Sequence, residues 1–350
     1  MEQVKDSPGL LELLPHPGFL VQENIIVRVN ASAAAMQVTV GTPIGELLDG
    51  CREDYEGFSG GCLYLTLSLS GALLGACALR MEAGDVFLLD SGQEDAVLQS
   101  LALASRQLRL PLSNIMISAE SLFSQLPESP EAQEAAARLN RGLYQLLRLV
   151  GNMSDADSGL TRRETLSIGG VFDEIFEKAG TLCQQAGFHL EYSGLKEDIY
   201  AIADRQQLER AVYNLLSNAM KFSPAGSTIT AWLTRRGRKL CLQIQDAGEG
   251  ILPADLFHRY LRQNTLEDSR FGMGLGMVLV RACAASHGGT VLVNTPEGGG
   301  TRVTMTLTLR QNADDILHSP TLRLEYTGGR DSALIELSQQ LPWELYLPGK

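Results

Sequence analysis

The sequence predicts a multidomain α+β protein, because its pattern changes twice along 350 residues. Residues 1–92 mix short strand-like runs with turns, and residues 93–157 carry long helical periodicity. Residues 165–310 then alternate helices with strands. At about 100–200 residues per domain, the chain has room for two or three domains. Residues 311–350 form an extension with a strand-like LRLEY and a helix-like SALIELSQQ, and their pattern assigns them no role.

Composition limits the classes of partner. With 44% hydrophobic and 20% charged residues, the chain has the make-up of an ordinary globular protein. A net charge of −12 argues against nucleic acid or an anionic membrane as the main partner, since both attract cationic surfaces. It does not argue against a nucleotide, because one local phosphate cradle suffices on an acidic protein.

Cysteines and the start of the chain indicate a compartment. The six cysteines are scattered without a CxxC pair or a His/Cys cluster, which argues against a zinc site or a disulfide framework and favours a reducing cytoplasm. The start, MEQVKDSPGLLELL, lacks a basic-then-apolar signal segment. We therefore expect a cytoplasmic protein.

An uncharged run over residues 62–79 is long enough to be considered as a membrane span. Its first half, CLYLTLSL, places leucine at every second position, which is the period of a half-buried strand. Ser70-Gly71 then predicts a turn into a second strand, Ala72 to Arg80, so a hairpin is favoured over a span. The preceding stretch LLELLPHPGFLVQENIIVRVNASAAAM resembles the start of a PAS sensor domain, in which two strands ending at Asn30 lead into small helices.

Two helices with apolar seams follow. The seam positions, spaced by three and four, are Leu101, Ser105, Leu108, Leu112, Ile115, Ala119, Leu122 and Leu126 on the first helix, and Leu139, Leu143, Leu146, Val150 and Met153 on the second. Pro127, Ser129 and Pro130 mark the loop between them. Because a hairpin cannot bury both seams alone, we expect a homodimeric four-helix bundle through residues 93–157. The alternative is a hairpin packed against its own chain.

The segment LERAVYNLLSNAMKFSPAGS carries the strongest functional signal. On a helix, its apolar residues share one face, while Asn214, Asn218 and Lys221 fall on the opposite face with Arg210. Two amides one turn apart and a nearby cation suit a polyphosphate bound to Mg²⁺, which prefers oxygen ligands. A solvated helix face explains the same stripe when it is taken alone.

Three further elements follow at fitting distances. Strand KLCLQIQD places the carboxylate of Asp246 on its apolar face, where it needs a hydrogen-bond donor such as an adenine amino group. The glycines of the loop 246–250 let backbone approach a ligand closely. Glycines at 272, 274 and 276 open an apolar helix and aim amides at an anion, and a Gly-Gly-Gly-Thr run ends at Thr301 before a last strand.

In this order and spacing the elements resemble the N, G1, F (residues 256–260), G2 and closing GT boxes of the Bergerat-type ATP-binding α/β sandwich, as found in sensor histidine kinases. The resemblance implies ATP and Mg²⁺ as ligands, with Asn218 on the metal, Asn214 and Lys221 facing phosphates, and Asp246 on adenine. It assigns the cradle, and the lid between Leu261 and Phe271, to Gly248, Gly250, Gly272, Gly274 and Gly276, with Thr301 closing the site.

The helical hairpin resembles the dimerisation and phosphoacceptor domain of the same family, but its nucleophile is missing. The family pattern His-Glu-Leu-Arg-x-Pro-Leu reads Arg-Gln-Leu-Arg-Leu-Pro-Leu over residues 106–112. Arg106 stays protonated and offers no lone pair, and Gln107 replaces the acid that would orient the histidine. Pro111 is expected to kink the helix rather than end it. The chain therefore cannot phosphorylate itself at the usual place.

Three functions remain open. The first is a two-component signalling protein that binds ATP·Mg²⁺ without phosphorylating its own hairpin, acting through its conformation, a response regulator or a partner histidine kinase. The second is an active kinase whose acceptor lies on a partner. The third is an interaction scaffold that does not use ATP. Preserved nucleotide boxes favour the first over the third.

Overall fold

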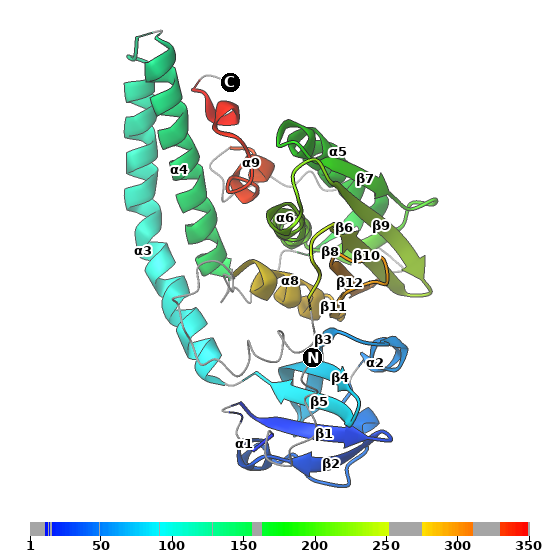
Figure 1. The fold of residues 1–350 in the computed structure, drawn as a ribbon. Coiled ribbons are helices and arrows are strands. Elements are labelled where there is room, and N and C mark those ends of the chain that lie inside the picture. Colours follow the sequence, from blue (N-terminus) through cyan, green and yellow to red (C-terminus); the bar gives the residue numbers. More distant parts are fainter. Residues whose placement is uncertain are drawn as a thin grey trace.

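The computed structural model describes residues 11–12, 14, 16–48, 50–90, 92–127, 129–155, 163–251, 275–310 and 330–348. Over these ranges the chain is a mixed α+β structure with a long helical hairpin beside two sheet-containing regions (Figure 1). Among the helices so described, none is long and apolar enough to cross a membrane.

The N-terminal region is built on five antiparallel strands in the order β2-β1-β5-β4-β3. Its elements are β1 (Gly18–Gln22), β2 (Ile25–Val29), α1 (Ala31–Ala35), η1 (Ile44–Glu46), α2 (Arg52–Gly57), β3 (Cys62–Leu69), β4 (Ala72–Met81) and β5 (Gly84–Leu89). Asn30 ends the first hairpin and caps α1, its side chain accepting from the backbone N–H groups of Ala33 at 2.9 Å and Gly18 at 3.0 Å. The predicted strand hairpin over the uncharged run is confirmed as β3–β4.

One cysteine pair departs from the expectation drawn from the spacing of the cysteines. Cys62 on β3 and Cys77 on β4 form a disulfide, with Cα atoms 6.4 Å apart. Fifteen residues separate them in sequence, but the β3–β4 register sets Cys77 opposite Tyr64, only two residues from Cys62. The spacing alone could not reveal this pairing, because the register of the hairpin decides it. The disulfide therefore removes the argument for a reducing compartment that was drawn from the scattered cysteines.

The helical hairpin consists of α3 (Gly92–Phe123) and α4 (Pro130–Asp155). Helix α3 continues through Pro111, so the prediction that this proline does not end the helix is confirmed. Leu112 is 6% exposed and packs with Met116, Ala119, Leu143 and Val150 between the two helices.

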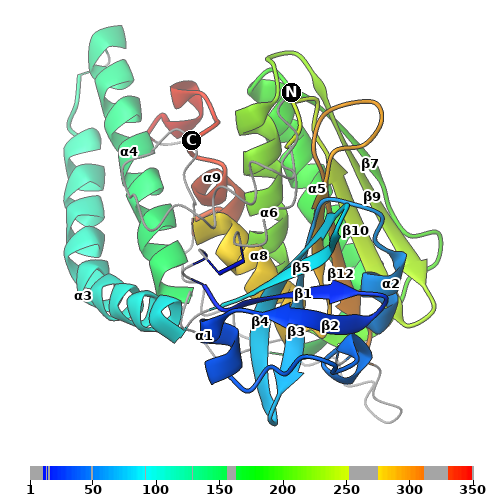
Figure 2. The same cartoon turned by 60° about the horizontal axis from the view of Figure 1, so that its bottom comes forward.

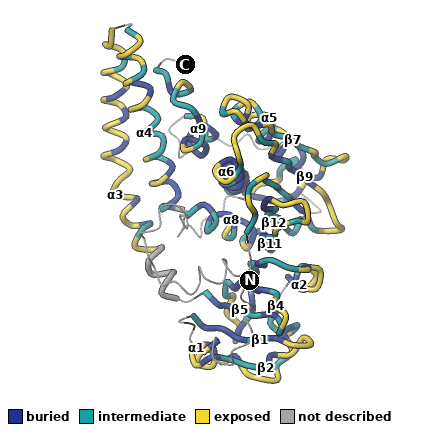
Figure 3. The backbone as a smooth tube through the Cα atoms, in the orientation of Figure 1, coloured by how far each residue is buried: buried dark blue, intermediate teal, exposed yellow. Residues whose placement is uncertain are grey.

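Other seam positions of the hairpin point away from this contact. They are exposed in the single chain, as the outer side of α3 shows in Figure 3, and comprise Leu108, Ile115, Leu122 and Leu126 on α3 with Leu139 and Leu146 on α4. The predicted seam therefore divides into a buried row within the hairpin and an exposed apolar row.

The α/β region holds the largest apolar core, between helices and the strands β9–β12. Its elements are β6 (Glu164–Ser167), α5 (Ile168–Gln185), β7 (His189–Ser193), β8 (Tyr200–Ala203), α6 (Arg205–Phe222), β9 (Thr228–Arg236), β10 (Lys239–Gln245), α8 (Leu275–Ser286), β11 (Val291–Asn294) and β12 (Arg302–Thr308). Strands β6 and β8 pair separately.

The strands of the N-terminal region and the strands β7 and β9–β12 of the α/β region form one continuous sheet. Strand β3 pairs antiparallel with β11, Leu63 lying opposite Leu292, and this creates one ten-stranded sheet in the order β2-β1-β5-β4-β3-β11-β12-β10-β9-β7 (Figure 2). Asp54 on α2 reinforces the junction: it accepts from the Thr290 hydroxyl at 2.9 Å and pairs with Lys239 at 3.0 Å. The N-terminal region is therefore joined directly to the α/β region as well as through the hairpin.

The C-terminal segment, residues 330–348, contains α9 (Ser332–Glu336) and η2 (Trp343–Tyr346). It lies between α4 and α6 (Figure 1). Ala333, Leu337, Leu341 and Tyr346 are buried in the core of the α/β region, and the Tyr346 ring meets Tyr144 of α4 edge to face at 5.1 Å. The helix expected from SALIELSQQ is present as α9, whereas the strand-like LRLEY lies outside the described residues.

Candidate nucleotide site

Helix α6 carries the amide stripe found in the sequence. Asp204 caps its N-terminus by accepting from the Gln207 N–H at 3.1 Å, and the helix runs to Phe222. Asn218 is half-buried and Lys221 is exposed at the C-terminal end. These two side chains lie where a ligand beside the helix can reach them.

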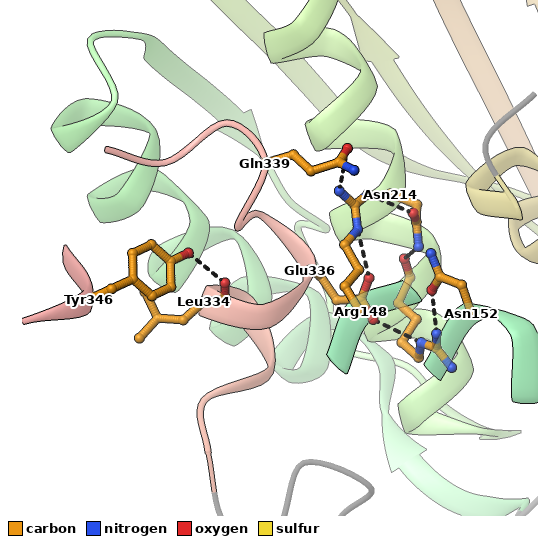
Figure 4. A network of polar contacts seen from close by, with 8 residues as sticks. Arg148, Asn152, Asn214, Leu334, Glu336, Gln339 and Tyr346 are labelled. Carbon is orange, nitrogen blue, oxygen red and sulfur yellow. Dashed lines mark hydrogen bonds and ion pairs between the residues drawn. The ribbon is translucent and has the colours of Figure 1, made fainter. Parts of the chain in front are cut away.

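Asn214, one turn earlier, is 1% exposed and already engaged. Its Oδ1 accepts from Arg148 Nη2 of α4 at 3.1 Å, and its Nδ2 donates to the Arg210 carbonyl at 2.8 Å. The expected stripe is therefore not one solvated face. Its N-terminal half is covered by α4 and the C-terminal segment (Figure 4), and its C-terminal half is accessible.

Asp246 lies directly after the C-terminal end of β10, an inner strand of the sheet, and is half-buried. Its Oδ1 accepts from the backbone N–H groups of Thr301 at 2.8 Å and Gly248 at 2.9 Å. Burial raises the pKa of this carboxyl, and the hydrogen bonds from Thr301 and Gly248 oppose that rise. A partly desolvated carboxylate held by two amides is a fixed acceptor for a donor on a ligand.

Two glycine loops approach each other around Asp246. Gly300 has a φ of +75°, and a Cβ there would lie 2.1 Å from the Asp246 carbonyl oxygen, so only glycine fits. Gly250 has a φ of +81° and would place a Cβ 2.8 Å from the Thr295 side chain. The loop after β10 and the loop before β12 are thus packed backbone to backbone, and the Asp246 N–H donates to the Thr301 carbonyl at 2.9 Å.

Gly276 belongs to the first turn of α8, where a Cβ would lie 2.6 Å from Asn214 Oδ1. This glycine therefore serves close packing of α8 on α6. The other predicted parts of the cradle lie outside the described residues: Gly272, Gly274, the F box at 256–260 and the lid between Leu261 and Phe271.

The donor set fits a nucleotide better than a free metal ion. The structure contains, in its described ranges, no group of three or more His, Cys, Asp or Glu residues able to hold a metal. Asn218 alone offers an accessible amide oxygen on the stripe. Mg²⁺ keeps phosphate and water ligands when protein donors are few, so a metal here would depend on the nucleotide for most of its shell.

The predicted phosphoacceptor position lies on α3. Arg106 and Gln107 are both exposed, while Arg109 Nη2 donates to Ser154 Oγ of α4 at 2.8 Å. A guanidinium therefore occupies the exposed surface where the family resemblance places a histidine.

The sequence did not predict the buried polar groups that link α6 to α4 and α9. Arg148, Arg210 and Glu336 form a buried network between α4, α6 and α9, joined by Asn152 (Figure 4). The one available signal was a carboxylate enclosed by apolar residues in Leu334-Ile335-Glu336-Leu337. His287 was also missed: its Nε2 accepts from the Asp204 N–H at 3.1 Å, at the start of α6.

Comparison with known proteins gives these features a context. Residues 203–311 match the family model described as "Histidine kinase-, DNA gyrase B-, and HSP90-like ATPase". The histidine protein kinase DivJ of Caulobacter vibrioides is 33% identical over 59% of this chain and 36% of its own length. The sensor histidine kinase CusS of Escherichia coli K12 is 26% identical over 58% of this chain and 44% of its own length.

Among solved structures, full-length ShkA in complex with AMPPNP matches with a TM-score of 0.47 and 21% identity, covering 61% of this chain and 47% of that chain. The chain thus spans about a third to a half of the length of these relatives. Residues 203–311 of the chain therefore form an ATPase domain of the kind that the family model describes. These matches support the sensor histidine kinase family for the part of the chain that they cover.

The buried His287 predicts a pH-dependent component of stability. Burial lowers the pKa of its imidazole, so the unfolded chain takes up a proton more readily than the folded one. This contribution is complete above the ordinary histidine pKa of about 6.5 and is lost as the pH falls from there toward the lower folded pKa.

We expect the urea midpoint of the wild type to fall between pH 7.5 and pH 5.5 by more than that of His287→Gln, which keeps an acceptor but does not titrate. His189→Gln, at an exposed position of β7, is the matched control and should follow the wild type. Equal pH dependence in wild type and His287→Gln contradicts the prediction.

Proposed function

We propose that this protein is a signalling member of the sensor histidine kinase family that binds ATP·Mg²⁺ but does not phosphorylate its own hairpin at the usual position. One observation carries the proposal: the loops around Asp246 are built as a nucleotide site requires, while the acceptor position on α3 holds Arg106. ATP supplies a transferable γ-phosphoryl group when bound. Asp246 accepts from the adenine amino group, Asn218 contributes an oxygen to the metal, and Lys221 faces the phosphates.

The N-terminal region serves as a PAS-like sensor in this proposal. Its first two strands, β1 and β2, the Asn30 cap and the short helices that follow support the resemblance seen in the sequence. Its junction with the α/β region at β3–β11 gives a sensed signal a direct route to the ATPase domain, in addition to the route along α3.

A homodimer completes the proposed assembly. The exposed apolar row repeats every seven residues, at Leu108, Ile115 and Leu122 on α3, and at Leu139 and Leu146 on α4. A heptad-spaced row on both helices of a hairpin suits a second copy of the same hairpin, which would bury it in a four-helix bundle. Output then passes through conformation, a response regulator or a partner kinase.

The first test concerns the dimer. Ile115 is 53% exposed, so Ile115→Glu leaves the hairpin's own core intact and places a charge in the proposed interface. Together with Leu146→Glu it should convert the dimer to a monomer, measured by light scattering at micromolar concentration. Asn114→Glu, at an exposed polar position, should remain dimeric. A wild-type monomer contradicts the proposal.

The second test concerns the nucleotide. Asp246→Asn should weaken ATP binding by about tenfold or more with or without Mg²⁺, since an amide lacks the charged acceptor for the adenine amino group. Asn218→Ala should chiefly reduce the increase in affinity that Mg²⁺ brings. Calorimetry on the whole chain measures both, and an absence of ATP binding by the wild type would remove the nucleotide proposal.

The third test restores the missing chemistry. Wild-type protein incubated with γ-labelled ATP should gain no acid-labile label, because Arg106 has no nucleophilic nitrogen. Arg106→His with Gln107→Glu supplies an imidazole and an orienting carboxylate at exposed positions of α3, and it should gain a phosphohistidine that is stable in base and lost in acid. Arg106→His alone should gain less. Phosphohistidine in the wild type overturns the proposal.

A further inference from the structure

The C-terminal segment places a fully buried carboxylate between two other parts of the chain. Glu336 of α9 is 0% exposed. Its Oε1 lies 3.0 Å from Arg210 Nε of α6, and its Oε2 lies 3.5 Å from Arg148 Nε of α4 (Figure 4). Both guanidinium groups are themselves more than nine-tenths buried. One acidic side chain thus ties the hairpin to the helix that carries the amide stripe.

Such a network forms or breaks as a unit. A buried carboxylate without its partners is strongly disfavoured, and so is a buried guanidinium that has lost its carboxylate. Withdrawal of α9 would therefore take from Arg148 and Arg210 the carboxylate that they share. The arrangement of α4 against α6 in this structure depends on the C-terminal segment.

The network also reaches the candidate nucleotide site. Arg148 uses Nη2 to bind Asn214 Oδ1 at 3.1 Å, and the Asn214 Nδ2 is held by the Arg210 carbonyl. Both ends of the Asn214 amide thus have hydrogen-bond partners within the protein. While Arg148 stays there, one of the two amide oxygens of the stripe is directed to the hairpin and not to a bound nucleotide or its metal.

A second set of contacts fixes the segment from outside. Arg141 of α4 donates to the carbonyl of Ser338 at 3.0 Å and to that of Gln339 at 2.9 Å, and Asn140 donates to the carbonyl of Tyr346 at 2.9 Å. These donors reach backbone carbonyls, so they hold the path of the segment irrespective of its side chains. Arg141 is only half-buried, and it can be removed without leaving a charge in the core.

We propose that residues 330–348 are an autoinhibitory clamp, which holds the ATPase domain on α4 of its own hairpin in a position of reduced nucleotide affinity. This proposal depends on the proposed nucleotide site and describes how nucleotide binding at that site is regulated. Release of the segment frees Arg148 from Glu336 and Asn214 from Arg148. Release also removes the tie between the ATPase domain and α4, while the pairing of β3 with β11 remains.

The test uses the full chain and two readouts, hydrogen exchange of residues 330–348 and affinity for ATP·Mg²⁺ by calorimetry. Arg141→Ala should accelerate exchange at least tenfold in α9 and η2 and tighten nucleotide binding about fivefold, within the usual range of coupling between sites. Glu336→Gln should act in the same direction. Glu344→Gln, an exposed glutamate of the same segment, is the matched control and should change neither readout.

Reciprocity gives an independent arm without any mutation. If release of the segment favours nucleotide binding, saturating ATP·Mg²⁺ must accelerate exchange of the segment in the wild type, because the ligand shifts the release equilibrium by the ratio of the affinities of the released and clamped states. Faster exchange in Arg141→Ala with unchanged or weaker ATP affinity overturns the clamp, as does wild-type exchange that ATP leaves unaltered. If neither wild type nor variants bind ATP, the nucleotide proposal itself fails and the segment is a structural tie only.

Discussion

The arrangement of the three parts around α6 depends on one buried charge, that of Glu336. Its removal would take from Arg148 of α4 and Arg210 of α6 the carboxylate that they share, and the loss of one member of a buried ion pair is destabilising. With it, α4, α6 and α9 share one polar centre surrounded by Ala333, Leu337 and other apolar side chains of the same core. Within this centre, Arg210 Nε donates to Glu336 Oε1 at 3.0 Å, a charge-assisted hydrogen bond that fixes α9 on α6.

A second constraint acts at the opposite side of the ATPase domain, where β3 extends the sheet through β11. Strand β11 would otherwise be an open edge, with unpaired backbone groups that invite association. Arg281 of α8 adds to this junction by lying over the Tyr64 ring, 4.8 Å from its centre, and 4.0 Å from Asp90 just before α3. The ATPase domain is therefore held from both sides, by the N-terminal region at the sheet and by the C-terminal segment at the hairpin.

Much of this architecture could be predicted from the sequence wherever the evidence is local. The leucine alternation before Ser70 gave the β3–β4 hairpin, and the seam gave both long helices, including passage through Pro111. The long-range pairings could not be predicted, because nothing in the sequence near Cys62 or Glu336 encodes which distant residue lies beside it. The same limit applies to Asn214. Helical periodicity correctly placed it on the stripe with Asn218. The periodicity could not show that α4 covers this part of the stripe, because that contact is made by Arg148, 66 residues away.

The Leu-Arg-x-Pro-Leu frame that follows Arg106 and Gln107 has structural roles of its own in the hairpin. Arg109 reaches across the hairpin to Ser154, and Leu112 is buried against α4, so both contribute to the hairpin whether or not phosphate is ever accepted. Arg106 and Gln107 make no comparable contact in the hairpin core and are exposed. Substitution at the two chemical positions therefore costs the fold little, whereas substitution in the frame would loosen the hairpin on which α9 and α6 are held. A sequence frame that looks catalytic can thus persist for packing alone, and the nucleotide loops, which have no such packing role at their accessible side, are the better guide to function.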